Sequence, residues 1–253
     1  MEAELASILE QAALTRTAVG KLTDLFPIDV PAAYRVQREN IRRRLNRGER
    51  MTGVKLGFSS KAKMAQTGVD EVIWGILTDA MAADAEAYDI DGLIHPKVEP
   101  ELVFRLGRRV SGTDDAGDAA LAVDAVAVGF EVLDSRYEGD TFTLPDVIAD
   151  NVSVAGFGTG PWHQLAAAPD ISDLPVTLSV NGEVVQEGST KAILGDPWGS
   201  LRSAVRLATQ AGITFEPGWI VLAGAITEPV PLTPGAHVEV SAGPLESAGL
   251  QAR

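Results

Sequence analysis

Apolar residues at helical spacing mark the first part of the chain. They recur three or four residues apart at Leu5, Ile8, Leu9 and Ala12. This pattern predicts an amphipathic helix over residues 2–22. A second helix is expected from Pro31 to Asn46 or Arg47, because proline suits a first helical turn and Gly48 can end a helix.

After residue 50 the pattern changes to alternation, which is typical of strands. The alternating segments are TGVKLG, VEPELVFRL, VAVGFEVLD, TLSVNGEVVQ, WIVLAGA and HVEVSAG. Asn181-Gly182 predicts a tight hairpin, and Asp196-Pro197 predicts the start of one later helix. A short helix is also expected over residues 60–66. The fold class is therefore α+β, with an N-terminal helical region and lysine-bearing strand (1–80) followed by a β-rich part (81–253) that forms one compact unit with it.

Composition narrows the chemistry. The chain has 253 residues, 21 basic and 35 acidic side chains, a formal net charge of −14, no cysteine and three histidines. The negative charge argues against nucleic acid, whose binding needs a basic surface. The lack of cysteine excludes disulfides and zinc-thiolate sites, so a bound metal would take oxygen ligands, as magnesium does. The N-terminal residues resemble neither a signal peptide nor a membrane span, which predicts a cytoplasmic protein with no membrane partner.

Three glutamates are candidate metal ligands. Glu99 and Glu101 stand two apart on a predicted strand and so share one face, while Glu131 interrupts an otherwise apolar strand. An ionised carboxylate in such a strand is costly to bury unless it is paired or binds a cation. Chance alone gives about five acidic pairs at this spacing in so acidic a chain. The residues by themselves therefore leave open a magnesium or manganese site and an ordinary solvated strand face.

Other polar residues stand next to apolar segments. Lys55 is flanked by apolar residues and must be paired or functional if its strand is central, and Asp79 is the candidate to orient it. A structural salt bridge is the alternative for Lys55. Asp150 and Asn151 fit an ordinary turn, and His95 fits a strand edge, with a catalytic role as the alternative for His95.

Several segments together resemble the fumarylacetoacetate hydrolase superfamily, in its 2-oxopent-4-enoate hydratase and 4-oxalocrotonate decarboxylase branch. The matching segments are GVKLGFSSKAKMAQTGVDEVIWGILTDAM, HPKVEPEL, FEVLDSRYE, IADN and LGDPWGSL. They span nearly the whole chain, and SKAKMAQTGV and VLDSRYE are more similar to the decarboxylase. The resemblance implies N-terminal helices followed by a mixed β-sheet roll or barrel.

The resemblance also implies a function. It makes Glu99, Glu101 and Glu131 ligands of Mg²⁺ or Mn²⁺, and Lys55 and Asp79 catalytic groups. The expected enzyme is a lyase of aromatic catabolism that decarboxylates 2-oxohex-3-enedioate to 2-hydroxypenta-2,4-dienoate. Hydration of 2-hydroxypenta-2,4-dienoate is the alternative, and an acylpyruvate hydrolase or a non-catalytic binding homologue is more distant. The expected partners are a small 2-oxo acid, further copies of the chain in a homo-oligomer, and the partner hydratase or decarboxylase.

Overall fold

The structure is a computed structural model that describes residues 1–58, 72–111, 119–139 and 141–253. The chain begins with α1 (Glu2–Thr15), α2 (Leu22–Leu25) and α3 (Val30–Asn46). The first helix ends earlier than predicted because Arg16 turns to a left-handed conformation, with φ of 54°. The second predicted helix is confirmed as α3, whose first turn is capped by Asp29. The helix predicted over residues 60–66 lies outside the described residues.

The larger sheet has eight strands. Six of them follow the order β2-β1-β9-β3-β4-β5, while β10 pairs with β3 and β6 pairs with β4. Their bounds are β1 (Met51–Gly57), β2 (Ile73–Thr78), β3 (Lys97–Leu106), β4 (Val123–Leu133), β5 (Val154–Thr159), β6 (His163–Gln164), β9 (Ile220–Ala225) and β10 (Val230–Pro231). β1 runs parallel to β9 and the other described pairs are antiparallel, so the sheet is mixed.

A smaller sheet packs against the larger one. Its order is β12-β11-β7-β8, with bounds β7 (Pro175–Val180), β8 (Glu183–Ser189), β11 (His237–Ala242) and β12 (Leu245–Gln251). The predicted hairpin is confirmed between β7 and β8, where Asn181 and Gly182 have φ of 53° and 83°, as a two-residue turn requires. The predicted later helix is α7 (Pro197–Gln210), capped by Asp196. The main apolar core lies between the two sheets and α7.

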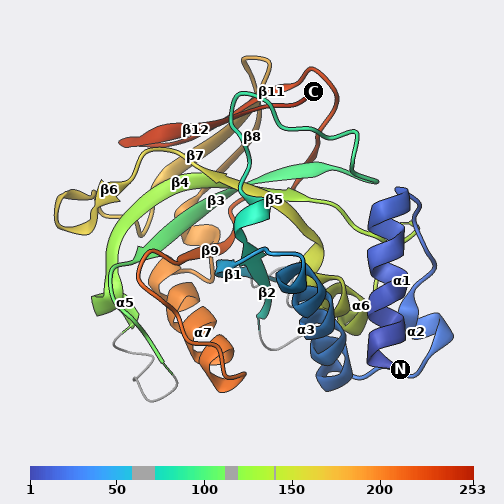
Figure 1. Ribbon diagram of the computed structural model, residues 1–253. Helices are drawn as coiled ribbons and strands as arrows, with labels where there is room; N and C mark the ends of the chain where they lie inside the picture. Colours follow the sequence, from blue (N-terminus) through green and yellow to red (C-terminus); the bar gives the residue numbers. More distant parts are fainter. Residues whose placement is uncertain (59–71, 112–118, 140) are drawn as a thin grey trace.

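The remaining helices are short: α5 (Ala119–Ala122) precedes β4, α6 (Leu144–Ala149) follows it, and 3-10 turns include η1 (Asp79–Met81), η3 (Asn151–Ser153), η4 (Leu165–Ala167) and η5 (Thr190–Ala192). Figure 1 shows the small sheet over the long curved strands β3 and β4, with α7 on one side and α1, α3 and α6 on the other. No helix in the described part of the chain is long and apolar enough to cross a membrane.

The larger sheet curls until its two edge strands, β2 and β5, approach each other. The segment after β2 bridges to β5 through Ala82 and Phe157. The side chain of Asn151 also bonds to the backbone of Ile76 in β2. The curl creates an inner face, from which Lys55 and the three candidate glutamates project.

Candidate metal centre

The three candidate glutamates come together on the inner face. Glu99 in β3 stands directly opposite Glu131 in β4, and Glu101 stands opposite Gly129. Each of the three offers a carboxylate oxygen, and these oxygens lie within 4.8 Å of one another. The alternation in the sequence therefore places Glu99 and Glu101 correctly on one face, and the register of β3 with β4 brings Glu131 to them.

All three carboxylates are buried: Glu99 is 5% exposed, and Glu101 and Glu131 are 0% exposed. One oxygen of Glu101, Oε2, accepts a hydrogen bond from the backbone N–H of Gly224 at 2.5 Å. The other, Oε1, is buried with no hydrogen-bond partner among the described residues. Burial, and next the charges of Glu131 and Glu99, raise the pKa of Glu101 well above its ordinary range.

Among the described residues, Lys55 supplies a cation to this cluster. It is 2% exposed, and its Nζ lies 2.8 Å from Glu131 Oε1. Burial alone would lower the pKa of Lys55, but the nearby carboxylates, led by Glu131, outweigh burial and raise the pKa above its ordinary value. Gly75 stands opposite on β2, where a Cβ atom would lie 3.2 Å from Lys55 Cδ and 2.8 Å from the carbonyl oxygen of Asn151. The glycine leaves room for the buried lysine stem.

The polar cluster occupies one part of the inner face, and apolar side chains fill another part. The apolar residues are Leu77, Met81, Val103, Val154, Phe157, Ile220 and Leu222. Water is thereby kept from much of the space beside the carboxylates, and charges interact more strongly in such surroundings than in water.

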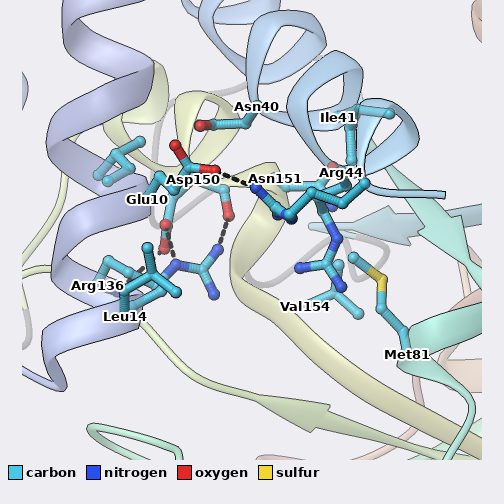
Figure 2. Close-up of a pocket in the computed structure, with 13 residues that line it drawn as sticks. Glu10, Leu14, Asn40, Ile41, Arg44, Met81, Arg136, Asp150, Asn151 and Val154 are labelled. Atoms are coloured by element: carbon cyan, nitrogen blue, oxygen red, sulfur yellow. Dashed lines mark hydrogen bonds and ion pairs between the residues drawn. The ribbon is translucent and has the colours of Figure 1, made fainter. Parts of the chain in front are cut away.

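A strained turn, η3, adjoins Lys55. Asn151, Val152 and Ser153 all have left-handed φ, at 52°, 55° and 58°. For residues other than glycine this conformation costs about 1–2 kcal/mol each, and it persists only where the surroundings hold it. Asp150, directly before the turn, is buried and forms an ion pair with Arg136. Figure 2 shows this pair and Asn151 at the wall of a cavity of about 200 Å³.

Comparison with known proteins identifies the family. The family model for the fumarylacetoacetate (FAA) hydrolase C-terminal region matches residues 60–250, most of the chain. The chain belongs to the fumarylacetoacetate hydrolase family. The resemblance noted in the sequence is thereby confirmed, and so is the predicted fold of helices followed by a mixed, curled sheet.

Within the fumarylacetoacetate hydrolase family, the chain is 43% identical to a 4-oxalocrotonate decarboxylase of a Pseudomonas species, over 92% of this chain and 91% of that one. It is 34% identical to a 2-keto-4-pentenoate hydratase of Paraburkholderia xenovorans, over 92% of this chain and 87% of that one. The solved 4-oxalocrotonate decarboxylase of Pseudomonas putida G7, complexed with magnesium and adipate, superimposes with a TM-score of 0.93. That match is 36% identical and covers 100% of this chain and 97% of the other.

The residues of this fumarylacetoacetate hydrolase family member suit a divalent metal ion. Among the described residues, three carboxylates that could share one cation lie beside a single lysine. Oxygen ligands favour hard cations such as Mg²⁺. A cation beside Glu101 would supply the partner that Oε1 lacks.

The structure does not bring Asp79 to Lys55. The carboxylate of Asp79 accepts a hydrogen bond from the backbone N–H of Arg50 at 2.9 Å, and its Oδ2 lies 3.3 Å from Arg50 Nε. Lys55 is paired in register with Gly75, and Asp79 stands four positions beyond Gly75, a length of about 13 Å along a strand. The prediction that Asp79 orients Lys55 did not take this separation along the strand into account.

The structure places His95 and the pair Asp150-Asn151 in different surroundings. The side chain of His95 is exposed, and its backbone N–H donates to Asp134 Oδ1 at 2.6 Å. The turn predicted at Asp150-Asn151 is present, but both residues are buried. Neither local sequence pattern predicted that this turn would contact Lys55. The signal available was the IADN segment, which carries part of the family resemblance.

Proposed function

We propose that the chain is a metal-dependent carboxy-lyase that converts 4-oxalocrotonate (2-oxohex-3-enedioate) to 2-hydroxypenta-2,4-dienoate and CO₂. The observation that carries the proposal is the buried cluster of Glu99, Glu101 and Glu131 around Lys55. Its support is the similarity over nearly the whole chain to proteins named 4-oxalocrotonate decarboxylase. Adipate, present in one of the solved relatives, is a saturated dicarboxylate with the same six carbons as this substrate.

The reaction breaks the bond between C5 and the C6 carboxylate. CO₂ leaves, and the electron pair delocalises through the C3–C4 alkene to the C2 oxygen, which takes one proton. When bound, a divalent cation supplies Lewis-acid stabilisation of negative charge on a 2-oxo acid.

The chain's own residues have separate tasks. Glu99, Glu101 and Glu131 would hold the cation. The ammonium of Lys55, protonated and buried, offsets the charge of a dianionic substrate in a chain of net charge −14 and can supply the proton that the C2 oxygen takes. The apolar residues of the inner face exclude water from the reacting carbons.

The test gives the purified protein Mg²⁺ and each candidate substrate, and follows CO₂ release and dienoate absorbance separately. We expect CO₂ and dienoate to form in equal amounts from 2-oxohex-3-enedioate. Consumption of 2-hydroxypenta-2,4-dienoate without CO₂ would select the hydratase function, which the 34% identical relative makes the second candidate.

Some predictions go beyond what the similarity to known proteins supports. Magnesium is proposed over manganese because a solved relative is complexed with magnesium. The catalytic role of Asp79, the homo-oligomer, the complex with a partner hydratase, the place in aromatic catabolism and the cytoplasmic location stay predictions.

A further inference from the structure

A backbone carbonyl shares the ammonium of Lys55 with Glu131. The carbonyl oxygen of Val152 accepts a hydrogen bond from Lys55 Nζ at 3.3 Å. Val152 is the middle residue of the three in the left-handed turn η3. A β-branched residue disfavours this conformation, so the turn must be held in place by its surroundings.

The side chain of Asn151 ties this turn to β2. Its Oδ1 accepts a hydrogen bond from the backbone N–H of Ile76 at 2.9 Å, and its Nδ2 donates to the carbonyl oxygen of Ile76 at 2.9 Å. One amide thus pairs with both backbone groups of a strand residue, as a neighbouring strand would. Ile76 follows Gly75, the residue opposite Lys55, so the amide fixes the turn to the strand beside the lysine.

The ion pair of Arg136 and Asp150 holds the near end of the turn. Asp150 Oδ2 also accepts a hydrogen bond from Ser153 Oγ at 3.0 Å. On one side Asp150 and Asn151 line the cavity of about 200 Å³, so packing does not support the turn there (Figure 2). Polar contacts must therefore hold the turn in place on that side.

We propose that Asn151 is a positioning residue, which holds the Val152 carbonyl against Lys55 and so fixes where the ammonium points. The inference rests on the proposed function, in which Lys55 acts on the substrate. In that function Glu131 binds both the metal ion and the ammonium of Lys55. The Val152 carbonyl accepts no other hydrogen bond from the described residues, so it can hold Lys55 while Glu131 binds the metal ion.

Gln37 offers a matched control. It is also fully buried, and its Nε2 donates to the carbonyl oxygens of Trp74 at 2.9 Å and Ile148 at 3.2 Å. Through its amide it therefore ties α3 to the same strand, β2, and to α6, the helix that precedes η3. No described hydrogen bond connects Gln37 to Lys55 or to η3.

The experiment compares Asn151→Ala with Gln37→Ala in the Mg²⁺-loaded protein. Both variants are expected to lower the unfolding temperature. Asn151→Ala should lower kcat about 10- to 100-fold with KM within about twofold, because a misplaced reacting group lowers the rate of the chemical step. Gln37→Ala should keep kcat within about twofold of wild type. Equal kcat losses in the two variants would overturn the positioning role.

Asn151→Gly separates the amide from the backbone strain. Glycine adopts a φ near 52° readily but cannot bond to Ile76. We expect Asn151→Gly to lose as much kcat as Asn151→Ala, and it also serves if Asn151→Ala fails to fold. Wild-type kcat in Asn151→Gly would show that the amide does not position Lys55.

A readout without turnover keeps this inference separate from the proposed function. Acetic anhydride labelling of Lys55, quantified by mass spectrometry, should be slow in wild type and Gln37→Ala, and at least about tenfold faster in Asn151→Ala. Equal labelling in all three proteins would overturn the inference. Absence of turnover in wild type would overturn the proposed function and leave the labelling comparison valid.

Discussion

Two buried ion pairs lie near the same turn, and they differ in the number of carboxylates that the structure places around each cation. Arg136 pairs with Asp150, one cation with one anion. Lys55 pairs with Glu131, but Glu99 and Glu101 lie in the same cluster. The first pair joins one carboxylate to one cation, whereas the second cluster holds three carboxylates and one lysine among the described residues.

The two clusters also differ in how many of their polar atoms form hydrogen bonds. Arg136 donates to the Asp150 carboxylate, to the carbonyl oxygen of Asp150 and, at 2.7 Å, to the carbonyl oxygen of Asp134. In the lysine cluster, Glu101 Oε1 accepts no hydrogen bond in the described part of the chain. Removing one partner of a buried ion pair is strongly destabilising, whereas several carboxylates close together can bind a divalent cation. We therefore expect the Arg136 pair to matter for folding and the lysine cluster to matter for activity.

The largest expected effect is on activity. Glu101→Gln removes one anionic ligand with little change in shape, and we expect kcat/KM with Mg²⁺ to fall about 1,000-fold, or about 4 kcal/mol. Without metal the variant should be at least as stable as wild type, because a buried carboxyl of raised pKa is replaced by a neutral amide. Steady-state kinetics and urea unfolding measure the two quantities.

Glu49→Gln is the control for this variant. Glu49 is also largely buried, but it contacts Arg44 and Thr78 outside the cluster. It should keep kcat/KM within about twofold. Full Mg²⁺-dependent activity in Glu101→Gln would contradict the ligand assignment.

The second effect is on stability. Arg136→Met should lower the free energy of unfolding by about 3 kcal/mol, since it leaves the buried Asp150 without its partner. The loss of stability is expected near the low end of the usual range for removing one partner of a buried ion pair, because Asp150 can take up a proton. Arg50→Met removes the partner of Asp79 at the exposed end of β2 and should cost under about 1 kcal/mol. Equal losses in the two variants, measured in urea, would show that burial of the pair is unimportant.

The glutamate cluster and the turn η3 differ in how far the sequence predicts them. Strand alternation places Glu99 and Glu101 on one face because a side-chain period of two is a local property of the chain, whereas Glu131 joins them through the pairing of β3 with β4. The hairpin at Asn181-Gly182 and the cap at Asp196 are also local, and both are confirmed. The fold class follows from the order of such elements and from the family resemblance.

The contacts around η3 are not local. Asn151 meets Ile76 across 75 residues, and Lys55 meets Val152 across 97. They depend on the curl that brings β2 near β5, which no short pattern specifies. For Asp79 the sequence suggested a contact that the structure does not form. Asp79 directly follows β2, the strand that pairs with the strand of Lys55, but the register of the two strands keeps the two residues apart.

The smallest expected effect is a dependence of stability on pH at Asp150. Burial raises the pKa of Asp150 to about 6, although Arg136 acts in the opposite direction. Because the folded-state pKa lies above the ordinary value of 3.8, folding favours the protonated form. The stabilisation from this group is therefore present below about pH 4 and is lost as the pH rises through 6, by about 2 kcal/mol between pH 4 and pH 7.

Asp150→Asn isolates this contribution from the other carboxylates, which titrate equally in both proteins. The free energy of unfolding of wild type, minus that of Asp150→Asn, should fall by about 2 kcal/mol from pH 4 to pH 7 in urea titrations. A difference that rises with pH would mean that Arg136 outweighs burial and that the pair is stronger than its position implies. In that case the contrast with the lysine cluster would sharpen further, because the Arg136 pair would contribute stability at neutral pH.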